Sequence, residues 1–180
     1  MAEQQTLYTI GHSNHPWERF VELLQGPGIR LVADVRSYPG SRKWPHYRRE
    51  HLESRLPELG IAYQWFPDLG GRRKEPAGAD SSDAGLDSPG FRAYAAHMRT
   101  ARFAQAMTEL LAAAAAVPTA VLCAEALFWR CHRKLLSDYA TAVRGWRVLH
   151  ILPDGHLREH RVTSFARVSE GRLCYPAPLS

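Results

Sequence analysis

The sequence is poor in cysteine and in long hydrophobic runs, and both shortages narrow what the protein can be. Its 180 residues include three cysteines, an odd number that does not suit a scaffold of paired disulfides. No apolar stretch is long enough to span a membrane, and the first residues lack the pattern of a signal peptide. We therefore expect a soluble, cytoplasmic protein without a membrane partner.

Basic residues are in modest excess over acidic ones. The formal net charge is +5 with the nine histidines counted as neutral, which favours anionic partners such as nucleic acid or nucleotides. The hydrophobic content of 45% is enough to bury the core of one domain. We expect residues 1–180 to form a single domain.

Alternating strand-like and helix-like segments predict an α/β fold. Helical periodicity is expected after Trp17, over 48–59, over 91–116 as one broken helix or two, and over 131–143. Strands are predicted at 7–10, 29–33, 61–66, 119–123 and 146–152, followed by a turn at 154–155 and an antiparallel edge strand over 157–162. This alternation indicates a mostly parallel sheet flanked by helices. Residues 75–90 are rich in Ala, Gly, Asp, Ser and Pro, so a mobile surface loop is expected there.

The stretch 119–134 has the layout of a site. Its apolar strand ends in Cys123 and Glu125, passes through an aromatic loop, and continues as Cys131, His132 and Arg133 at the start of a helix. In open α/β sheets, ligands bind beyond the carboxyl ends of the strands, where helix N-termini also point their N–H groups. These five residues are therefore candidates for one site.

Two other strands are predicted to end at the same edge of the sheet. His12 follows the first strand and Asp34 follows the second. Because parallel strands joined by a helix end on the same edge, these two side chains should lie close together.

The cysteines allow more than one interpretation. Cys123 at the end of a buried strand is commonly a small core residue, but a helix N-terminus and Arg133 can also make it a nucleophile. A phosphatase-like loop is less favoured, because the residues between Cys123 and Arg130 include a carboxylate and two large aromatics but no glycine. The spacing of Cys123, Cys131 and His132 also differs from the close pairs of structural zinc sites, so no metal or cofactor is expected.

Residues 36–49 interleave basic and aromatic side chains, and Gly70 to Lys74 adds cations from a third strand end. Cations neutralise phosphates while rings stack on bases or wedge into a duplex. The alternative is a solvated loop with its rings folded onto the core. Candidates for contact with a nucleic-acid backbone are Arg42, Lys43, Arg48, Arg72, Arg73 and Lys134.

Several motifs together carry a family resemblance. They are Tyr-Thr-Ile-Gly-His-Ser at 8–13, Asp-Val-Arg-Ser-Tyr-Pro-Gly-Ser at 34–41, Leu-Gly-Gly-Arg at 69–72, Cys-Ala-Glu at 123–125 and Cys-His-Arg at 131–133. In this order and spacing, from about Leu7 to Ile151, the chain resembles the bacterial family called domain of unknown function 488. The resemblance implies a single α/β domain whose strand-end motifs converge, and activity of some members on modified bases in DNA.

The residues match what cleavage of an N-glycosidic bond in DNA requires. A carboxylate stabilises the cationic sugar, for which Asp34 and Glu125 are candidates. A donor assists the departing base, for which His12 or His132 is a candidate near neutral pH. A base flipped from a duplex needs a pocket with aromatic walls. Candidates for substrate contact are Tyr8, Ser13, Arg36, Tyr38, Ser41, Trp44, Phe128, Trp129 and Arg133.

The sequence therefore predicts a DNA-binding, glycosylase-like hydrolase that repairs a modified or damaged base in a duplex. Two other classes stay open. One is a cysteine enzyme of phosphatase or sulfurtransferase type with Cys123 or Cys131 as nucleophile. The other is a nucleic-acid-binding module without catalysis.

Overall fold

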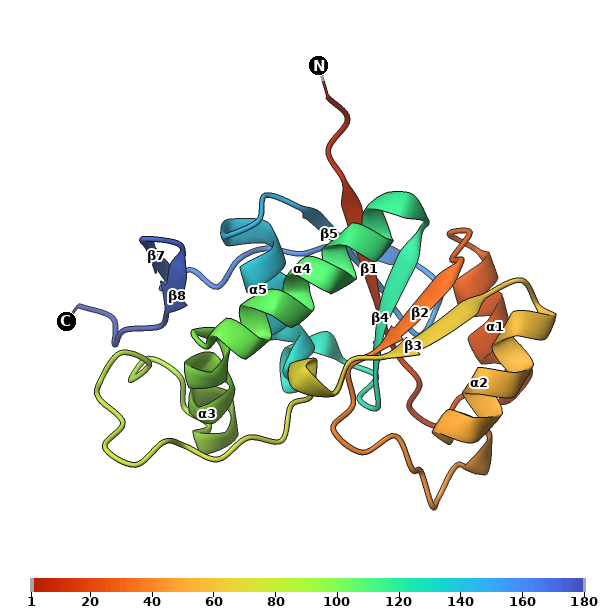
Figure 1. The fold of residues 1–180 in the computed structure, drawn as a ribbon, viewed down its shortest axis with the longest axis horizontal. Helices are drawn as coiled ribbons and strands as arrows, with labels where there is room; N and C mark the ends of the chain where they lie inside the picture. Colours follow the sequence, from red (N-terminus) through yellow and green to blue (C-terminus); the bar gives the residue numbers. More distant parts are fainter. Residues whose placement is uncertain (1, 180) are drawn as a thin grey trace.

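The computed structural model describes residues 2–179, which form a six-stranded sheet covered by helices on both faces (Figure 1). Strands β1 to β5 run parallel, and β6 pairs antiparallel with β5 at one edge. The sheet order is β3-β2-β4-β1-β5-β6. The bounds are β1 Thr6–Gly11, β2 Leu31–Asp34, β3 Ala62–Trp65, β4 Thr119–Cys123, β5 Arg147–Ile151 and β6 Leu157–Glu159. The predicted α/β class with a mostly parallel sheet and an antiparallel edge strand is confirmed.

The helices divide between the two faces according to the direction in which the chain crosses the sheet. From β1 to β2 and then to β3, the chain moves toward the β3 edge of the sheet. Because such parallel connections are right-handed, α1 (Trp17–Gln25) and α2 (Arg49–Glu58) cover the same face (Figure 1). It then returns through α3 (Pro89–Met98), α4 (Ala101–Ala116) and α5 (Arg133–Ala142), which cover the other face. The predicted helical region 91–116 thus forms two helices, and the Thr100 hydroxyl caps α4 by accepting from the Phe103 N–H.

Strand residues alternate between the two cores that result. Ala33, Val35 and Val121 pack against α3 to α5, whereas Val32 and Leu122 pack against α1 and α2. β4 is buried along its whole length at the centre of the sheet. Three short 3-10 turns complete the connections: η1 (Pro45–Tyr47), η2 (Pro67–Leu69) and η3 (Phe128–Arg130).

The C-terminal part differs from the sequence-based expectation. β6 ends at Glu159 rather than at residue 162, and a separate antiparallel hairpin follows, formed by β7 (Arg167–Ser169) and β8 (Arg172–Cys174). The hairpin strands are short and mostly exposed, so their pattern carries little apolar periodicity. The hairpin lies beside the helices of the α3–α5 face (Figure 1).

Part of the predicted mobile loop 75–90 is anchored to this C-terminal segment. Asp83 is buried and forms an ion pair with Arg99, and Leu86 is buried in the core. The N–H of Tyr175 donates to Asp83, and the N–H of Gly85 donates to the Tyr175 carbonyl. Residues 75–81 of the loop are exposed. Across residues 2–179, no helix has the length and apolar character needed to cross a membrane.

Candidate functional site

The site lies where β1, β2 and β4 end. Gly11 pairs with Cys123 and Asp34 with Leu122, so the three strands end at one edge of the sheet. After β4 the chain turns across the end of β1, where the N–H of Ser13 donates to the Ala124 carbonyl at 2.9 Å. A side chain at position 11 would overlap the Glu125 carbonyl, so this crossing requires glycine.

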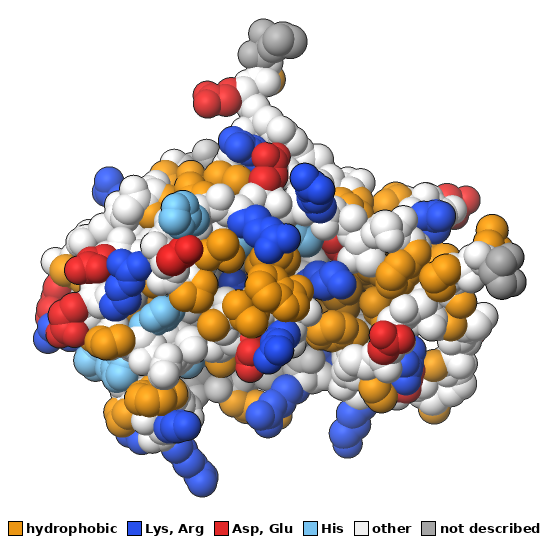
Figure 2. Space-filling view, turned by 180° about the vertical axis from the view of Figure 1, so that it is seen from behind, with side chains coloured by type: hydrophobic (Ala, Val, Ile, Leu, Met, Phe, Trp, Pro, Cys, Tyr) orange, Lys and Arg blue, Asp and Glu red, His pale blue; other side chains and the backbone are white. Residues whose placement is uncertain are grey.

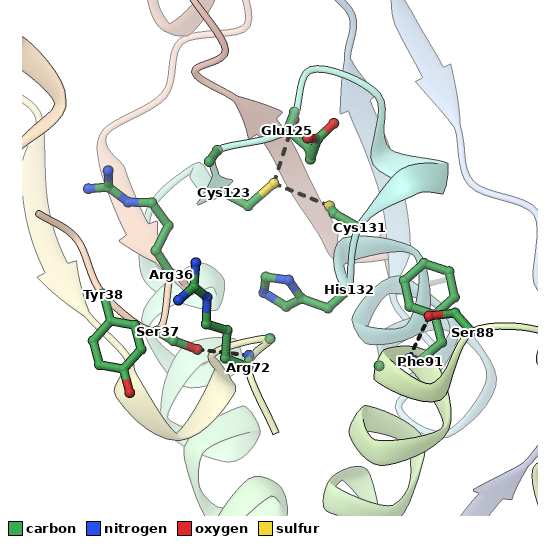
Figure 3. Close-up of a pocket in the computed structure, with 13 residues that line it drawn as sticks. Arg36, Ser37, Tyr38, Arg72, Ser88, Phe91, Cys123, Glu125, Cys131 and His132 are labelled. Carbon is green, nitrogen blue, oxygen red and sulfur yellow. Dashed lines mark hydrogen bonds between the residues drawn. The ribbon is translucent and has the colours of Figure 1, made fainter. Parts of the chain in front are cut away.

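A cavity of about 340 Å³ opens at this edge (Figure 3). That volume lies at the lower end of the range for small-molecule sites. The His132 ring extends from the start of α5 into the space between Cys131 and Arg72. The lining residues are Arg36, Ser37, Tyr38, Gly71, Arg72, Ser88, Gly90, Phe91, Cys123, Ala124, Glu125, Cys131 and His132. We call this the first cavity.

A second cavity, of about 480 Å³, adjoins the first. Both are lined by Arg36, Tyr38, Ala124 and Glu125, so these residues form the boundary between them. The other lining residues of the second cavity are His12, Ser13, Asn14, Ser41, Lys43 and Trp44. The predicted convergence of three strand ends therefore produces two adjoining spaces, one beside the thiols and one beside the basic, aromatic segment.

Glu125 is the carboxylate at this boundary. Its residue is exposed, and within residues 2–179 its carboxylate makes no hydrogen bond or ion pair, although its backbone carbonyl accepts from Arg133. A carboxylate that no protein donor occupies is available to a ligand.

Asp34 is fully buried, and it does not line either cavity. Its two oxygens accept from the Arg36 side chain at 2.9 and 2.6 Å, from the Arg36 N–H and from the Tyr63 hydroxyl. The prediction that Asp34 acts at the substrate is therefore not supported, because these four donors occupy the carboxylate. Its role is to hold Arg36, which faces both cavities.

His12 and His132 are placed at the site as predicted, but not as acids near neutral pH. Burial lowers the pKa of each to about 4. His12 donates from Nδ1 to the Ser13 carbonyl, and its Nε2 lies 3.4 Å from the Arg36 guanidinium. His132 donates from Nε2 to the Val35 carbonyl, which leaves Nδ1 as an acceptor. Both rings are therefore neutral at pH 7, and Arg36 links His12 to Asp34.

The two cysteines of the cluster lie side by side. The Sγ atoms of Cys123 and Cys131 are 3.2 Å apart, and both residues line the first cavity (Figure 3). Cys131 also accepts from the N–H and the Nε of Arg133, each at 3.4 Å. The hydrogen bond from Cys123 and the positive charge of Arg133 lower the pKa of Cys131 to about 6, whereas burial raises the pKa of Cys123.

Arg133 is a buried structural cation rather than a substrate contact. It is fully buried, and besides Cys131 it donates to the carbonyls of Glu125 and Ala126 and to the Thr9 hydroxyl. The structure therefore does not present Arg133 to the cavity as a substrate contact, because its donors are directed to protein acceptors. It fixes the loop that carries Glu125.

A buried hydrogen-bonded chain runs from Arg133 to Asp138, and sequence reasoning missed it. Thr9 contacts His150 Nδ1 at 2.6 Å, His150 Nε2 contacts His160 Nδ1 at 2.9 Å, and His160 Nε2 contacts Asp138 at 2.7 Å. Arg133 donates to Thr9 at one end of the chain and Asp138 accepts at the other, so a continuous line of hydrogen bonds connects a buried cation to a buried carboxylate. Burial lowers the pKa of His150 to about 2. The sequence feature that could have indicated this chain is His150, a polar residue among the apolar residues of β5.

Several predicted contacts lie elsewhere. Tyr8 is within β1 and borders a cavity at the opposite, amino-terminal end of β4, near Pro118. Phe128 stacks on His150, and with Trp129 it lines a cavity beside β6. None of these three side chains lines the first or the second cavity.

The predicted backbone-binding cations are split. Arg72 and Lys43 line the cavities, and Arg42 and Arg48 are exposed beside them on the 36–49 segment. Arg73 instead donates to the carbonyls of Gly70 and Pro67, and Lys134 lies in α5 and lines neither cavity. On the face opposite to that of Figure 1, Lys and Arg side chains are scattered around a hydrophobic patch (Figure 2).

Lining residues from distant segments were also missed. Ser88 and Phe91 reach the first cavity from the start of α3, where the Ser88 hydroxyl accepts from the Phe91 N–H (Figure 3). Gly71 lies against the His132 ring, where any side chain would collide with it. Ser37 is bonded to the N–H of Arg72. Gly71 belongs to the Leu-Gly-Gly-Arg motif at 69–72, whereas no sequence motif marked Ser88 or Phe91 as a site residue.

The comparisons with known proteins agree with the motif-based resemblance. The family model described as Domain of unknown function DUF488 matches residues 16–140, a range that contains α1 to α4, β2 to β4 and the thiol cluster. No curated protein and no solved structure matched the chain. Because this match spans more than half of the sequence, the chain belongs to the family of domain of unknown function DUF488.

Proposed function

We propose that the chain cleaves the N-glycosidic bond of a modified or damaged base in duplex DNA, with Glu125 as the carboxylate at the sugar. The observation that carries this proposal is the place of Glu125, exposed and unpaired within residues 2–179, at the boundary of two adjoining cavities. In the proposed arrangement the base occupies the first cavity and the sugar lies at the boundary.

The chemistry follows from the charges at that boundary. Cleavage passes through a cationic sugar, which a nearby carboxylate stabilises while it orients the attacking water. His12 and His132 are neutral at pH 7, so neither protonates the departing base. Arg36 lines both cavities, but its guanidinium is bonded to Asp34 and to the Tyr47 carbonyl, so Arg72 is the cation in the first cavity that would face the negative charge developing on the base. The free Nδ1 of His132 offers an acceptor for a base N–H.

The entrance suits a nucleic-acid backbone. Tyr38, which is 75% exposed, and Trp44, which is half-buried, both line the second cavity. Their rings would flank an extruded nucleotide where it enters. Within the 36–49 segment, Arg42, Lys43 and Arg48 have no ion-pair partner among residues 2–179. These cations are free to neutralise phosphates.

A cysteine phosphatase is less favoured by this geometry. A phosphate-binding thiol site needs a cation and N–H groups directed at the substrate, whereas Arg133 is fully buried and bonded to protein acceptors. Cys123 is also buried, and its sulfur contacts Cys131 and the Glu125 carbonyl.

The test compares Glu125→Gln with a control, Glu109→Gln, on the exposed face of α4. Duplex oligonucleotides carrying a panel of modified and damaged bases are incubated with each protein, and abasic sites are revealed by alkaline strand cleavage. We expect the parent and Glu109→Gln to cleave at least one duplex. Glu125→Gln should bind that duplex equally well but cleave it about 100- to 10,000-fold more slowly.

Two results would contradict the proposal. If Glu125→Gln remains active while Cys131→Ser is inactive, the thiol enzyme is the correct class. If every duplex is retained and none is cleaved, the protein is a binding module.

A further inference from the structure

The thiol pair is a reactive arrangement that glycosidic cleavage does not use. Cys123 ends β4 and Cys131 precedes α5, and the fold brings their sulfur atoms to 3.2 Å. Both line the first cavity, and Cys131 is the more exposed of the two at 8% against 2%. The third cysteine, Cys174, belongs to β8 and lines neither cavity.

The surroundings of the two cysteines favour Cys131 as the nucleophile and Cys123 as its partner. Two donors of Arg133 and the thiol of Cys123 all point at Cys131. Cys123 has only the Glu125 carbonyl and Cys131 as polar contacts. With the pKa of Cys131 lowered and that of Cys123 raised, the single proton that the pair holds at neutral pH lies on Cys123. Thiolate character and access to a small reagent are what make a cysteine oxidisable.

We propose that Cys131 and Cys123 form a hydroperoxide-reactive dithiol in the wall of the first cavity, which converts reversibly to a disulfide. The co-reactant is a small hydroperoxide, such as hydrogen peroxide, that fits through the cavity. This reaction is separate from base excision and requires no DNA.

The steps balance as follows. The Cys131 thiolate attacks one peroxide oxygen, the O–O bond breaks, and hydroxide leaves while sulfur is oxidised to the sulfenic acid. The Cys123 sulfur then attacks the Cys131 sulfur, the S–O bond breaks, and water departs with the Cys123 proton. Two electrons pass from the two sulfurs to the peroxide. Thiol–disulfide exchange with a dithiol reductant reverses the change.

The required movement is small. A disulfide has an S–S bond of about 2.05 Å, so the sulfur atoms must approach by roughly 1 Å from their present 3.2 Å. The bond would close the loop 124–130, which contains Glu125, and it would remove the thiolate that Arg133 now contacts.

The experiment treats the full-length reduced protein with hydrogen peroxide and measures free thiols after denaturation, intact mass and cross-linked peptides. The parent should fall from three free thiols to one, lose the mass of two hydrogen atoms, and yield a peptide joining residues 123 and 131. Dithiothreitol should restore all three thiols. The control Cys174→Ser should form the same cross-link.

Single variants separate the two roles. Cys123→Ser should leave a sulfenic acid on Cys131 that dimedone traps, whereas Cys131→Ser should form no cross-link and no dimedone adduct at Cys123. The parent alone can overturn the proposal, even if a variant fails to fold. Retention of three thiols, at peroxide doses that consume a free model thiol, would do so, as would a cross-link involving Cys174. DNA cleavage enters none of these readouts.

Discussion

Asp34 ends β2 and Glu125 follows the neighbouring strand β4, but their surroundings give them different roles. Asp34 is fully buried and accepts four hydrogen bonds, including the bidentate pair with Arg36. Glu125 is exposed at the boundary of the cavities. A buried carboxylate that neutralises a buried cation contributes to the folded state, whereas an unpaired exposed one is free for chemistry.

We expect Asp34→Asn to destabilise the protein strongly. The amide leaves Arg36 as a buried cation without its counter-charge, and breaking such a pair costs about 3–5 kcal/mol of unfolding free energy. Urea denaturation measures the change, with the exposed Asp87→Asn as control and an expected effect within about 0.5 kcal/mol. An Asp34→Asn protein that is as stable as the parent but inactive would instead give Asp34 a direct catalytic role.

Acidification should destabilise the fold through its neutral histidines. The pKa values of His12 and His132 are about 4 in the folded protein and about 6.5 when unfolded, so the unfolded chain binds more protons between these values. Stability is therefore full above about pH 6.5 and is lost as pH falls toward 4, on the order of 2–3 kcal/mol per histidine.

Thermal melting between pH 7.5 and 4.5 measures this loss. His132→Asn should flatten the dependence, whereas the exposed His156→Asn should not change it. A melting temperature that does not respond to pH across that window would show that folding does not lower the pKa of these rings.

At the scale of elements, the segment between β2 and α2 is the proposed DNA contact. Replacing Arg42, Lys43 and Arg48 with Ala should reduce the slope of log affinity against log salt by roughly 2–3, because about 0.9 counterions are released per phosphate contact. A matched control replaces three exposed arginines elsewhere: Arg144, which follows α5, and Arg167 and Arg172 of the β7–β8 hairpin. An unchanged slope in the first triple variant would place the DNA surface elsewhere.

At the scale of the whole molecule, the C-terminal segment holds the loop over 75–90. Tyr175 is fully buried, donates its hydroxyl to Asp138 at 2.9 Å, and bonds through its N–H to Asp83. This connection lies beyond the matched family range, yet it braces both the loop and the buried chain that leads to Arg133.

Limited proteolysis should reveal that bracing. In the parent we expect the first cuts within residues 75–81, which are exposed, and few within the anchored part that follows. Tyr175→Ala should extend cleavage through residue 90 and cost about 3–5 kcal/mol, as large aromatic truncations in cores do. The control Tyr38→Ala removes a mostly exposed ring and should leave both properties unchanged. Equal cleavage across the whole loop in the parent would show that the anchor does not persist in solution.

The sequence by itself determined the α/β class, the parallel sheet and the edge at which the site lies. These depend on local periodicity and on strand ends, which neighbouring residues specify. Cys123, Glu125 and His132 were therefore placed correctly from their position after β4. The same local logic failed for Tyr8 and Trp129, because the direction of a side chain depends on how its element packs.

Only the tertiary structure decided which groups are chemically available. Asp34 is occupied because Tyr63 and Arg36 reach it from different segments, and His132 is neutral because surrounding elements exclude water from it. The lowered pKa of Cys131 depends on Cys123 and Arg133, and Arg133 is oriented in turn by Thr9 across the sheet. Charge and protonation follow from burial and from neighbours distant in sequence, which no local pattern of residues encodes.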